Sequence, residues 1–112
     1  FGYSNTDILL GPAYSDKQIE NALKNKGLRF RKLKNTAKTA AELIAAGNII
    51  LWFQNRMEYG PRALGARSIL ARPDDEKIKN RLNLMLKKRV WYQPFCPSIL
   101  REDCEKVFYY FR

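Results

Sequence analysis

Apolar residues recur at helical spacing in three stretches of the chain, and short continuous apolar runs lie between these stretches. The first helical stretch follows residues 1–14, which we expect to form an extended linker that closes on a Gly-Pro turn signal. Ser15 and Gln18 have the spacing of a capping box, and Gly27 follows as a C-terminal cap. The pattern therefore predicts a first helix with both ends marked.

Two longer helical patterns and a short one lie downstream. One helix is predicted from Thr36, as its N-cap, to Gly47. Another is predicted over residues 72–89, with acidic residues at its start and basic residues at its end, as the helix dipole favours. A last helix is predicted from Glu102. The buried stripe of the helix over residues 72–89 is predicted to be Ile78, Leu82, Met85 and Leu86.

Three runs are typical of strands. Residues 28–33 form a short strand pattern with basic residues on one face, residues 48–53 are continuously apolar, as in a strand buried on both faces, and residues 67–71 form a third run. Strands and helices that alternate in this way predict an α/β (α+β) fold, a twisted sheet with flanking helices. Ligands in open α/β sheets collect beyond the carboxyl ends of strands, so a site is expected after residue 53.

The sequence RMEYGPRALGARSIL, residues 56–70, concentrates charge around a Gly-Pro turn. Guanidinium groups bind carboxylate and phosphate oxygens at two points, and glycine lets backbone N–H groups approach a ligand. Pro61 and Gly65 also predict a single helical turn between them. This combination is typical of an oxyanion site. Its candidate residues are Arg56, Glu58, Gly60, Pro61, Arg62, Arg67 and Ser68.

A second interpretation of the same arginines stays open at this point. Arg62 and Arg67 would pair with Glu58 or with the acidic residues at 74 and 75, and would only hold the loop in place. The residue types and their spacing do not choose between the two interpretations. They also leave open which arginines contact a ligand.

Composition narrows the chemistry further. The chain has 112 residues, 46% of them apolar, which predicts one small globular domain, and its net charge of +10 predicts an anionic partner. It contains no histidine, which excludes Ser-His-Asp and Cys-His nucleophilic systems within this chain, and we identify no metal-ligand set. No apolar run reaches the roughly 18 residues of a membrane helix and no signal peptide is recognisable, so a cytoplasmic location is expected.

The order of the residues is more specific than their composition. The segments RMEYGPRALGARSILARP, DEKIKNRLN, KKR and QPFCPSIL together resemble the C-terminal part of the nodulation-type and antibiotic-type O-carbamoyltransferases. The resemblance covers nearly the whole chain. It implies a YrdC-like α/β domain over residues 15–112. Because the chain opens on Phe1 and not on Met, we expect it to be an excised piece and the domain to be a partial one that is not active alone.

The resemblance also implies an activity. The YrdC-like domain would convert carbamoyl phosphate and ATP, with Mg²⁺, into carbamoyladenylate. An N-terminal actin-like domain, which would carry the enzyme's metal ion, would then pass the carbamoyl group to a hydroxyl of an acceptor that the sequence does not identify. Carried onto this chain, catalytic roles fall to Arg62, Glu58 and Arg67, and binding roles fall to Arg56, Gly60, Pro61, Ser68, Lys87, Arg89 and Ser98.

Two positions depart from the family pattern. Many relatives carry E-P-F-R where this chain has VWYQ at residues 90–93, so one expected arginine is missing. Asn55 stands where glycine is frequent. Both departures concern the surroundings of the site and leave the central motif intact.

Two other classes of function remain as alternatives. The net charge of +10 would suit a nucleic-acid-binding module, although the lysines are spread over three predicted helices while the arginines concentrate in one loop. The chain would be a docking domain if all the motif arginines were paired internally. The aromatic tail KVFYYFR, residues 106–112, would favour self-association if it were exposed.

Overall fold

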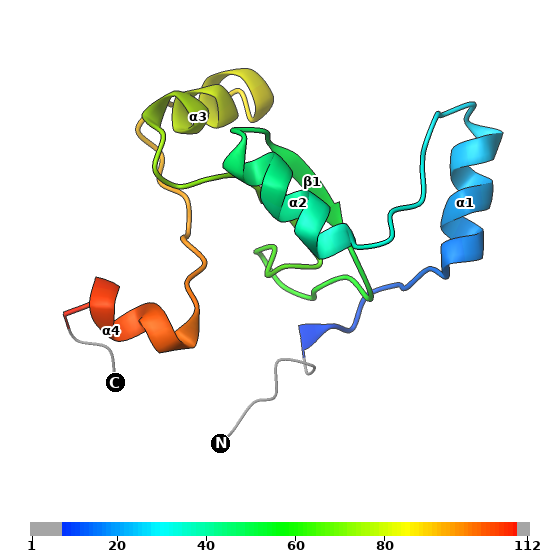
Figure 1. Ribbon diagram of the computed structural model, residues 1–112, viewed down its shortest axis with the longest axis horizontal. Helices are drawn as coiled ribbons and strands as arrows, with labels where there is room; N and C mark the ends of the chain where they lie inside the picture. Colours follow the sequence, from blue (N-terminus) through cyan, green and yellow to red (C-terminus); the bar gives the residue numbers. More distant parts are fainter. Residues whose placement is uncertain (1–7, 110–112) are drawn as a thin grey trace. The chain divides into compact units, whose positions relative to one another are not determined.

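The computed structural model describes residues 8–109. The chain divides into two compact units, one that extends to Arg72 and one that starts at Pro73, and each is described by itself. The first unit contains helices α1 (Asp16–Asn25) and α2 (Thr36–Ala45) and strands β1 (Ile50–Phe53) and β2 (Arg67–Leu70) (Figure 1). The second contains α3 (Glu76–Asn80), η2 (Arg81–Leu86), η3 (Arg101–Asp103) and α4 (Cys104–Val107).

Capping defines both helices of the first unit. The predicted capping box is confirmed at α1, where the Ser15 hydroxyl accepts a hydrogen bond from the Gln18 N–H and the Gln18 side chain reaches back to the Ser15 backbone. Gly27 follows α1 at a φ of 64°, the left-handed conformation that a C-terminal glycine supplies. The N-cap of α2 is Asn35 and not Thr36, because the Asn35 side chain accepts a hydrogen bond from the Lys38 N–H at 2.9 Å.

The sheet of the described residues is a two-stranded antiparallel ribbon, against which α2 packs (Figure 1). Ile50 pairs with Leu70, and Phe53 pairs with Arg67. The prediction of a strand buried on both faces is wrong, since burial alternates along β1 and Leu51 is 73% exposed. An antiparallel ribbon commonly has one face packed against the protein and the other face exposed to solvent. A continuous apolar run in the sequence does not reveal that one face is exposed.

Two other predictions of local structure are also wrong. Residues 28–33 belong to no strand and run through an open connection between α1 and α2. Residues 62–64 form no helical turn. Instead they lie in the connection between β1 and β2, so the charged loop joins two antiparallel strands and does not follow a parallel strand.

The second unit begins with a helix that is shorter than predicted. The Asp75 side chain caps α3 by accepting a hydrogen bond from the Lys77 N–H, and the helix continues into η2 as a π-helix. Ile78 and Leu82 are buried as predicted, whereas Met85 is 72% exposed and Leu86 47% exposed. The i→i+5 bonding of a π-helix widens the turn, and the apolar stripe therefore leaves the buried face after Leu82.

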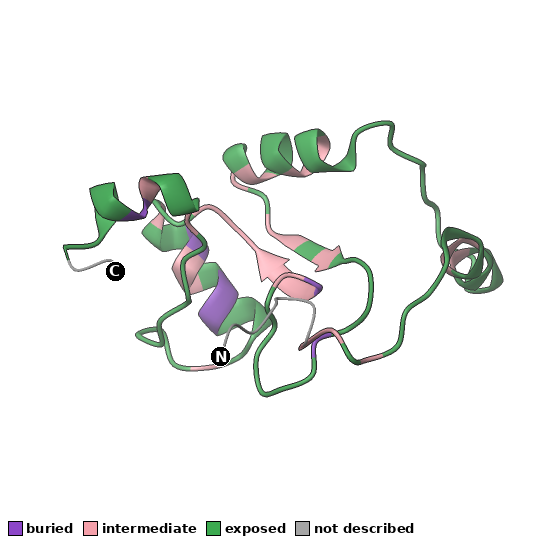
Figure 2. Cartoon of the chain, turned by 90° about the horizontal axis from the view of Figure 1, so that it is seen from below, coloured by how far each residue is buried: buried purple, intermediate pink, exposed green. Residues whose placement is uncertain are grey.

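Buried residues are few in both units (Figure 2). The first unit buries Glu58 and Ala66, and the second buries Ile78, Leu82, Asn83 and Cys104. The predicted helix near Glu102 is present as η3 followed by α4. Two predicted segments are described only in part, because residues 1–7 of the extended linker and residues 110–112 of the aromatic tail lie outside the described residues. No helix among residues 8–109 combines the length and the apolar character that a membrane crossing requires.

Candidate functional site

A single buried carboxylate organises the loop between β1 and β2. Glu58 is 6% exposed, and its Oε1 accepts hydrogen bonds from the backbone N–H groups of Leu64 at 2.7 Å, Ala66 at 2.6 Å and Arg67 at 3.2 Å. These donors come from the return half of the loop. The RMEYGPRALG segment therefore closes around Glu58, and the Glu58 carboxylate holds the two halves of the loop together.

The same contacts determine the charge of Glu58. Burial would by itself raise the pKa of the carboxyl group, but the N–H donors of Ala66, Glu58 itself, Leu64 and Arg67 together outweigh burial and lower the pKa to about 2. Glu58 is consequently ionised at neutral pH and is a weak base. In this geometry its charge fixes the backbone of the loop.

Arg67 binds both ends of the loop through backbone carbonyl groups. Its Nη1 donates to the carbonyl oxygens of Gln54 at 2.7 Å and of Ala66 at 2.9 Å. Its Nη2 donates to those of Asn55 at 3.1 Å and of Pro12 at 3.4 Å. The guanidinium also lies over the ring of Phe53, with 3.5 Å between Cζ and the ring centroid. Most of the donor capacity of Arg67 is therefore used inside the protein.

Arg56 ties the loop to the segment that precedes α1. Its Nε donates to the Leu9 carbonyl at 3.0 Å and its Nη2 to the Leu10 carbonyl at 3.1 Å. Backbone hydrogen bonds reinforce this contact, from Gly11 N–H to the Met57 carbonyl at 2.9 Å and from Met57 N–H to the Pro12 carbonyl at 3.1 Å. Arg56 thus acts, like Arg67, on the backbone of its own chain.

Arg62 differs from the other two arginines. It is exposed, and within residues 8–109 no hydrogen bond or ion pair involves its guanidinium. The interpretation in which Arg62 and Arg67 pair with acidic side chains does not describe this loop, because Arg67 binds carbonyl oxygens and Arg62 has no partner in the described part of the chain. Arg62 is therefore the motif arginine whose whole guanidinium remains available to an anion.

The small residues of the loop have distinct conformational roles. Gly60 has a φ of 133°, which residues other than glycine rarely adopt, and Pro61 follows it on the exposed side of the loop. Ser68 accepts a hydrogen bond from the Gly65 N–H at 2.9 Å, which leaves its own O–H free to donate. Asn55 has a φ of 47°, and this left-handed conformation explains physically why glycine suits the position.

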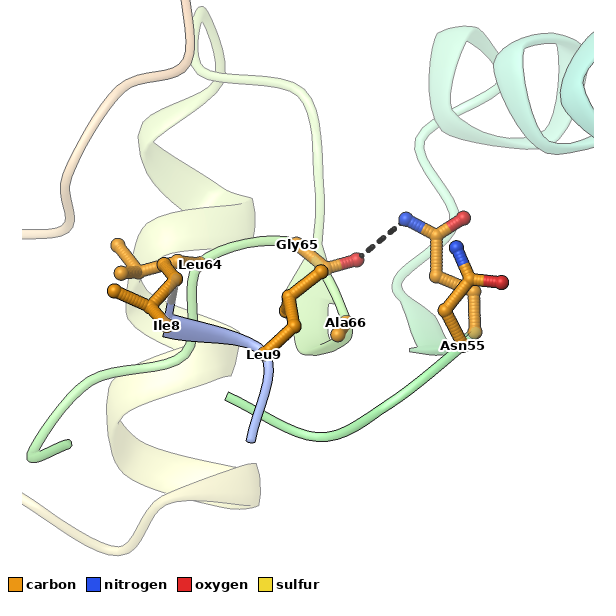
Figure 3. Close-up of a pocket in the computed structure, with 7 residues that line it drawn as sticks. Ile8, Leu9, Asn55, Leu64, Gly65 and Ala66 are labelled. Carbon is orange, nitrogen blue, oxygen red and sulfur yellow. Dashed lines mark hydrogen bonds between the residues drawn. The ribbon is translucent and has the colours of Figure 1, made fainter. Parts of the chain in front are cut away.

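Two shallow pockets flank the loop. The first has a volume of about 330 Å³ and is crossed at one side by a hydrogen bond from Gln54 Nε2 to the Gly65 carbonyl at 3.0 Å (Figure 3). Its lining residues are Ile8, Leu9, Gln54, Asn55, Leu64, Gly65 and Ala66. The second has a volume of about 400 Å³ and places two aromatic rings, Tyr14 and Phe53, beside Asp16 and Arg56. Both pockets have room for a small polar ligand.

The predicted site residues fall into both units. Arg56, Glu58, Gly60, Pro61, Arg62, Arg67 and Ser68 share the first unit and lie on one loop and the strand that follows it. Lys87, Arg89 and Ser98 belong to the second unit. Lys87 and Ser98 are exposed there, and Arg89 is half-buried. No group of three or more His, Cys, Asp or Glu residues within residues 8–109 is arranged to hold a metal ion.

Sequence reasoning missed two residues that shape these regions. Gln54 closes one side of the first pocket, and nothing in the pattern singled it out. Asn83 is fully buried in the second unit, and it bonds to the backbone carbonyls of Trp91 and Gln93 and to the side chain of Arg89. A single polar residue within the otherwise apolar run of residues 82–86 was the available signal for Asn83.

Comparison with known proteins identifies the class of protein. The family model described as carbamoyltransferase C-terminus matches residues 41–111, which is well over half of the chain and includes the whole charged loop. The match places the chain among the domains of transferases. The chain belongs to the carbamoyltransferase C-terminal family.

Individual relatives agree with this family. The chain is 46% identical over 103 residues to an uncharacterized protein of Methanocaldococcus jannaschii (88% of this chain, 17% of the relative). It is 46% identical over 105 residues to nodulation protein NolNO of Sinorhizobium fredii (91% and 15%). It is 46% identical over 66 residues to a 3'-hydroxymethylcephem-O-carbamoyltransferase of Streptomyces clavuligerus (59% and 12%). The chain spans less than a fifth of the length of these curated relatives.

Proposed function

We propose that this chain is the part of an O-carbamoyltransferase that binds ATP and carbamoyl phosphate and forms carbamoyladenylate from them. Membership of the carbamoyltransferase C-terminal family supports the reaction class. The relative from Streptomyces clavuligerus is named for O-carbamoyl transfer to a cephem hydroxymethyl group, which is the same class of transfer. The acceptor of the present protein is not part of the proposal.

The observation that carries the proposal is the state of the three motif arginines. Arg56 and Arg67 donate hydrogen bonds to backbone carbonyl groups, and Glu58 fixes the intervening turn. Arg62 is held on this rigid loop with its guanidinium exposed. A cation carried on a loop whose backbone is fixed in this way can stabilise negative charge that develops during phosphoryl or acyl transfer without moving protons. Arg62 would thus contact the anion, and the other two arginines would hold the loop.

Other ligands and partners follow from the same proposal. Magnesium would enter with ATP, held mainly by the phosphate oxygens, as is usual for this ion. An N-terminal actin-like domain of the same protein would carry a further metal ion and complete the transfer to the hydroxyl acceptor. The length of the relatives supports this arrangement, since they are several times longer than the region that matches this chain. We place the reaction in the cytoplasm, and we expect this piece alone not to complete the transfer.

Isothermal titration with ATP and with carbamoyl phosphate tests the proposal. Both ligands should bind, and Arg62→Ala should weaken binding by about tenfold or more, since one hydrogen bond to a charged group contributes about 1.5–3 kcal/mol. Arg29→Ala is the matched control, because Arg29 is also an exposed arginine of the first unit but lies outside the loop. Absence of heat with either ligand from a folded sample, or equal effects of the two substitutions, would contradict the proposal.

A nucleic-acid-binding function remains a second candidate because of the net charge of +10. The exposed connection between α1 and α2 carries Arg29, Arg31 and Lys34, which would suit a phosphate backbone. This function predicts binding of a single-stranded oligonucleotide with a steep dependence on salt and with no preference for ATP. The same titrations, repeated with an oligonucleotide at two salt concentrations, distinguish the two candidates.

A further inference from the structure

The most completely buried polar side chain described in the second unit is an amide whose two N–H donors and whose oxygen all have hydrogen-bond partners. Asn83 is 0% exposed and lies in the π-helix η2. Its Nδ2 donates to the carbonyl oxygens of Trp91 and Gln93, both at 2.9 Å, and its Oδ1 accepts from Arg89 Nε at 2.7 Å. The opposite orientation of the amide would place oxygen against two carbonyl oxygens, so the chemistry fixes the orientation.

The contacts around Asn83 immobilise the Arg89 side chain. A backbone hydrogen bond also joins the two residues, since the Arg89 N–H donates to the Asn83 carbonyl at 2.8 Å. Lys88, which directly precedes Arg89, has a φ of 48°. The guanidinium lies over the ring of Phe95, with 4.5 Å between Cζ and the ring centroid. Arg89 is therefore held along its Nε edge by Asn83 and on one face by Phe95.

The terminal nitrogens of the guanidinium take no part in these contacts. Within residues 8–109, neither terminal nitrogen of Arg89 has a hydrogen-bond partner, so the four N–H donors of these two nitrogens are unused there. The partner on the Nε edge is a neutral amide and not a carboxylate. An aspartate in that place would cancel the charge of Arg89, whereas Asn83 orients the guanidinium and leaves its positive charge uncompensated.

Burial of an amide at this position also requires an explanation. A buried polar group costs free energy unless its hydrogen bonds are satisfied, and an apolar residue would continue the stripe of Ile78 and Leu82 at no such cost. The amide instead fixes one particular arrangement of the segment from Trp91 to Gln93 and of Arg89. Fixing the guanidinium before binding lowers the entropy lost when an anion is bound.

We infer that Asn83 is a positioning residue that, together with Phe95, presents the Arg89 guanidinium as a preformed two-point receptor for an oxyanion of the phosphate or carboxylate type. The identity of this anion as a phosphate group of ATP or carbamoyl phosphate rests on the proposed function. The positioning itself rests only on the contacts within the second unit.

The first test is a spectroscopic measurement on the unmodified protein. The Arg89 Nε–Hε signal in a ¹⁵N NMR spectrum should exchange slowly with water, because its hydrogen is bonded to a buried amide, and it should shift when inorganic phosphate is added. Arg81 is the internal control, since it is an exposed arginine of η2, the helix that carries Asn83. An Arg89 Nε–Hε signal that exchanges as fast as that of Arg81 in the folded protein would overturn the inference.

Substitutions then separate positioning from charge. Arg89→Lys keeps the charge but loses the two-point geometry, and it should weaken phosphate binding about tenfold, whereas Arg81→Lys should change it less than twofold. Asn83→Ala should make the Arg89 Nε–Hε signal exchange rapidly and weaken binding to a similar degree. If Asn83→Ala does not fold, Phe95→Leu removes the ring from the same guanidinium and should weaken binding severalfold.

The outcomes also separate this inference from the proposed function. Equal effects of Arg89→Lys and Arg81→Lys would mean that Asn83 has only a structural role. A fixed Arg89 that binds inorganic phosphate, in a protein that binds ATP and carbamoyl phosphate no better than inorganic phosphate, would support the positioning and contradict the proposed substrates.

Discussion

At the scale of single residues, the loop depends on the ionised state of one buried side chain. Glu58 accepts three backbone hydrogen bonds from the opposite half of the loop, and these bonds are strongest when the carboxyl group is charged. The sequence predicted that Glu58 and the arginines belong to one cluster. It did not predict that the arginines bind carbonyl oxygens, because every residue carries a carbonyl group and no pattern marks the ones that are used.

Acid should therefore weaken the first unit in a specific range of pH. The pKa of Glu58 is about 2 in the folded protein and its ordinary value is 4.5, so its contribution is complete above pH 4.5 and is lost as the pH falls toward 2. Urea denaturation at a series of pH values measures this dependence. Glu58→Gln should lower stability at pH 7 and flatten the dependence between pH 4.5 and 2.

Glu20 provides the control for this measurement. Its pKa is also lowered to about 2, by hydrogen bonds with Lys24 and Lys32, but these groups lie at the surface. Salt at about 0.5 M should screen the contribution of Glu20 and leave that of Glu58 largely unchanged. Acid dependence that persists unchanged in Glu58→Gln would show that the carboxylate does not organise the loop.

Asn55 allows a second prediction at this scale. Its φ of 47° is accessible to glycine and asparagine but costs other residues about 1–2 kcal/mol. Asn55→Gly should therefore change the stability of the first unit only slightly, whereas Asn55→Val should destabilise it by about 1–2 kcal/mol. Chemical denaturation of the two variants side by side measures the difference, and a tolerated valine would contradict the observed conformation.

At the scale of elements, capping residues were predictable and pairing partners were not. The box formed by Ser15 and Gln18 defines the start of α1 as the spacing predicted. At α2 two good capping residues are adjacent, and only the structure shows that Asn35 is used. Residues 28–33 have a strand pattern but form no strand. A strand also needs a neighbouring strand to pair with, and the alternation of residue types along the chain does not predict one.

The contact between the segment before α1 and the loop gives a prediction at this scale. A Cβ atom at Gly11 would lie 2.7 Å from Met57 Cβ and 2.9 Å from the Met57 carbonyl oxygen. Gly11→Ala should therefore force the two segments apart and destabilise the first unit by about 1–3 kcal/mol. Hydrogen exchange should accelerate at the amides of Met57 and Tyr59, which bond to this segment.

Gly27→Ala is the comparison for Gly11→Ala. Gly27 has a φ of 64° and nothing within 4 Å of its Cβ position, so substitution there should strain the end of α1 without reaching the loop. The amides of Met57 and Tyr59 should then keep their protection. Equal acceleration in both variants would mean that the segment before α1 does not support the loop.

At the scale of the whole molecule, order within the sequence was more informative than composition. The net charge of +10 admitted several anionic partners, while the order of residues in the RMEYGPRALG motif indicated the carbamoyltransferase family, which the match over residues 41–111 confirms. The α+β character was predicted, but the antiparallel ribbon was not. Long-range pairing depends on residues far apart in the chain, and local patterns contain little information about it.

The proposed role of Arg62 can be measured by following the formation of carbamoyladenylate by the full-length protein. With ATP, Mg²⁺ and carbamoyl phosphate present, ³¹P NMR should show carbamoyladenylate together with the pyrophosphate released from ATP and the inorganic phosphate released, with uptake of one water, from carbamoyl phosphate. Arg62→Ala should slow this formation by about 10²-fold or more, the usual effect of losing one group that stabilises developing charge, while Arg29→Ala should leave it unchanged. Formation of carbamoyladenylate at the same rate in Arg62→Ala as in the unmodified protein would show that Arg62 does not contact the reacting anion.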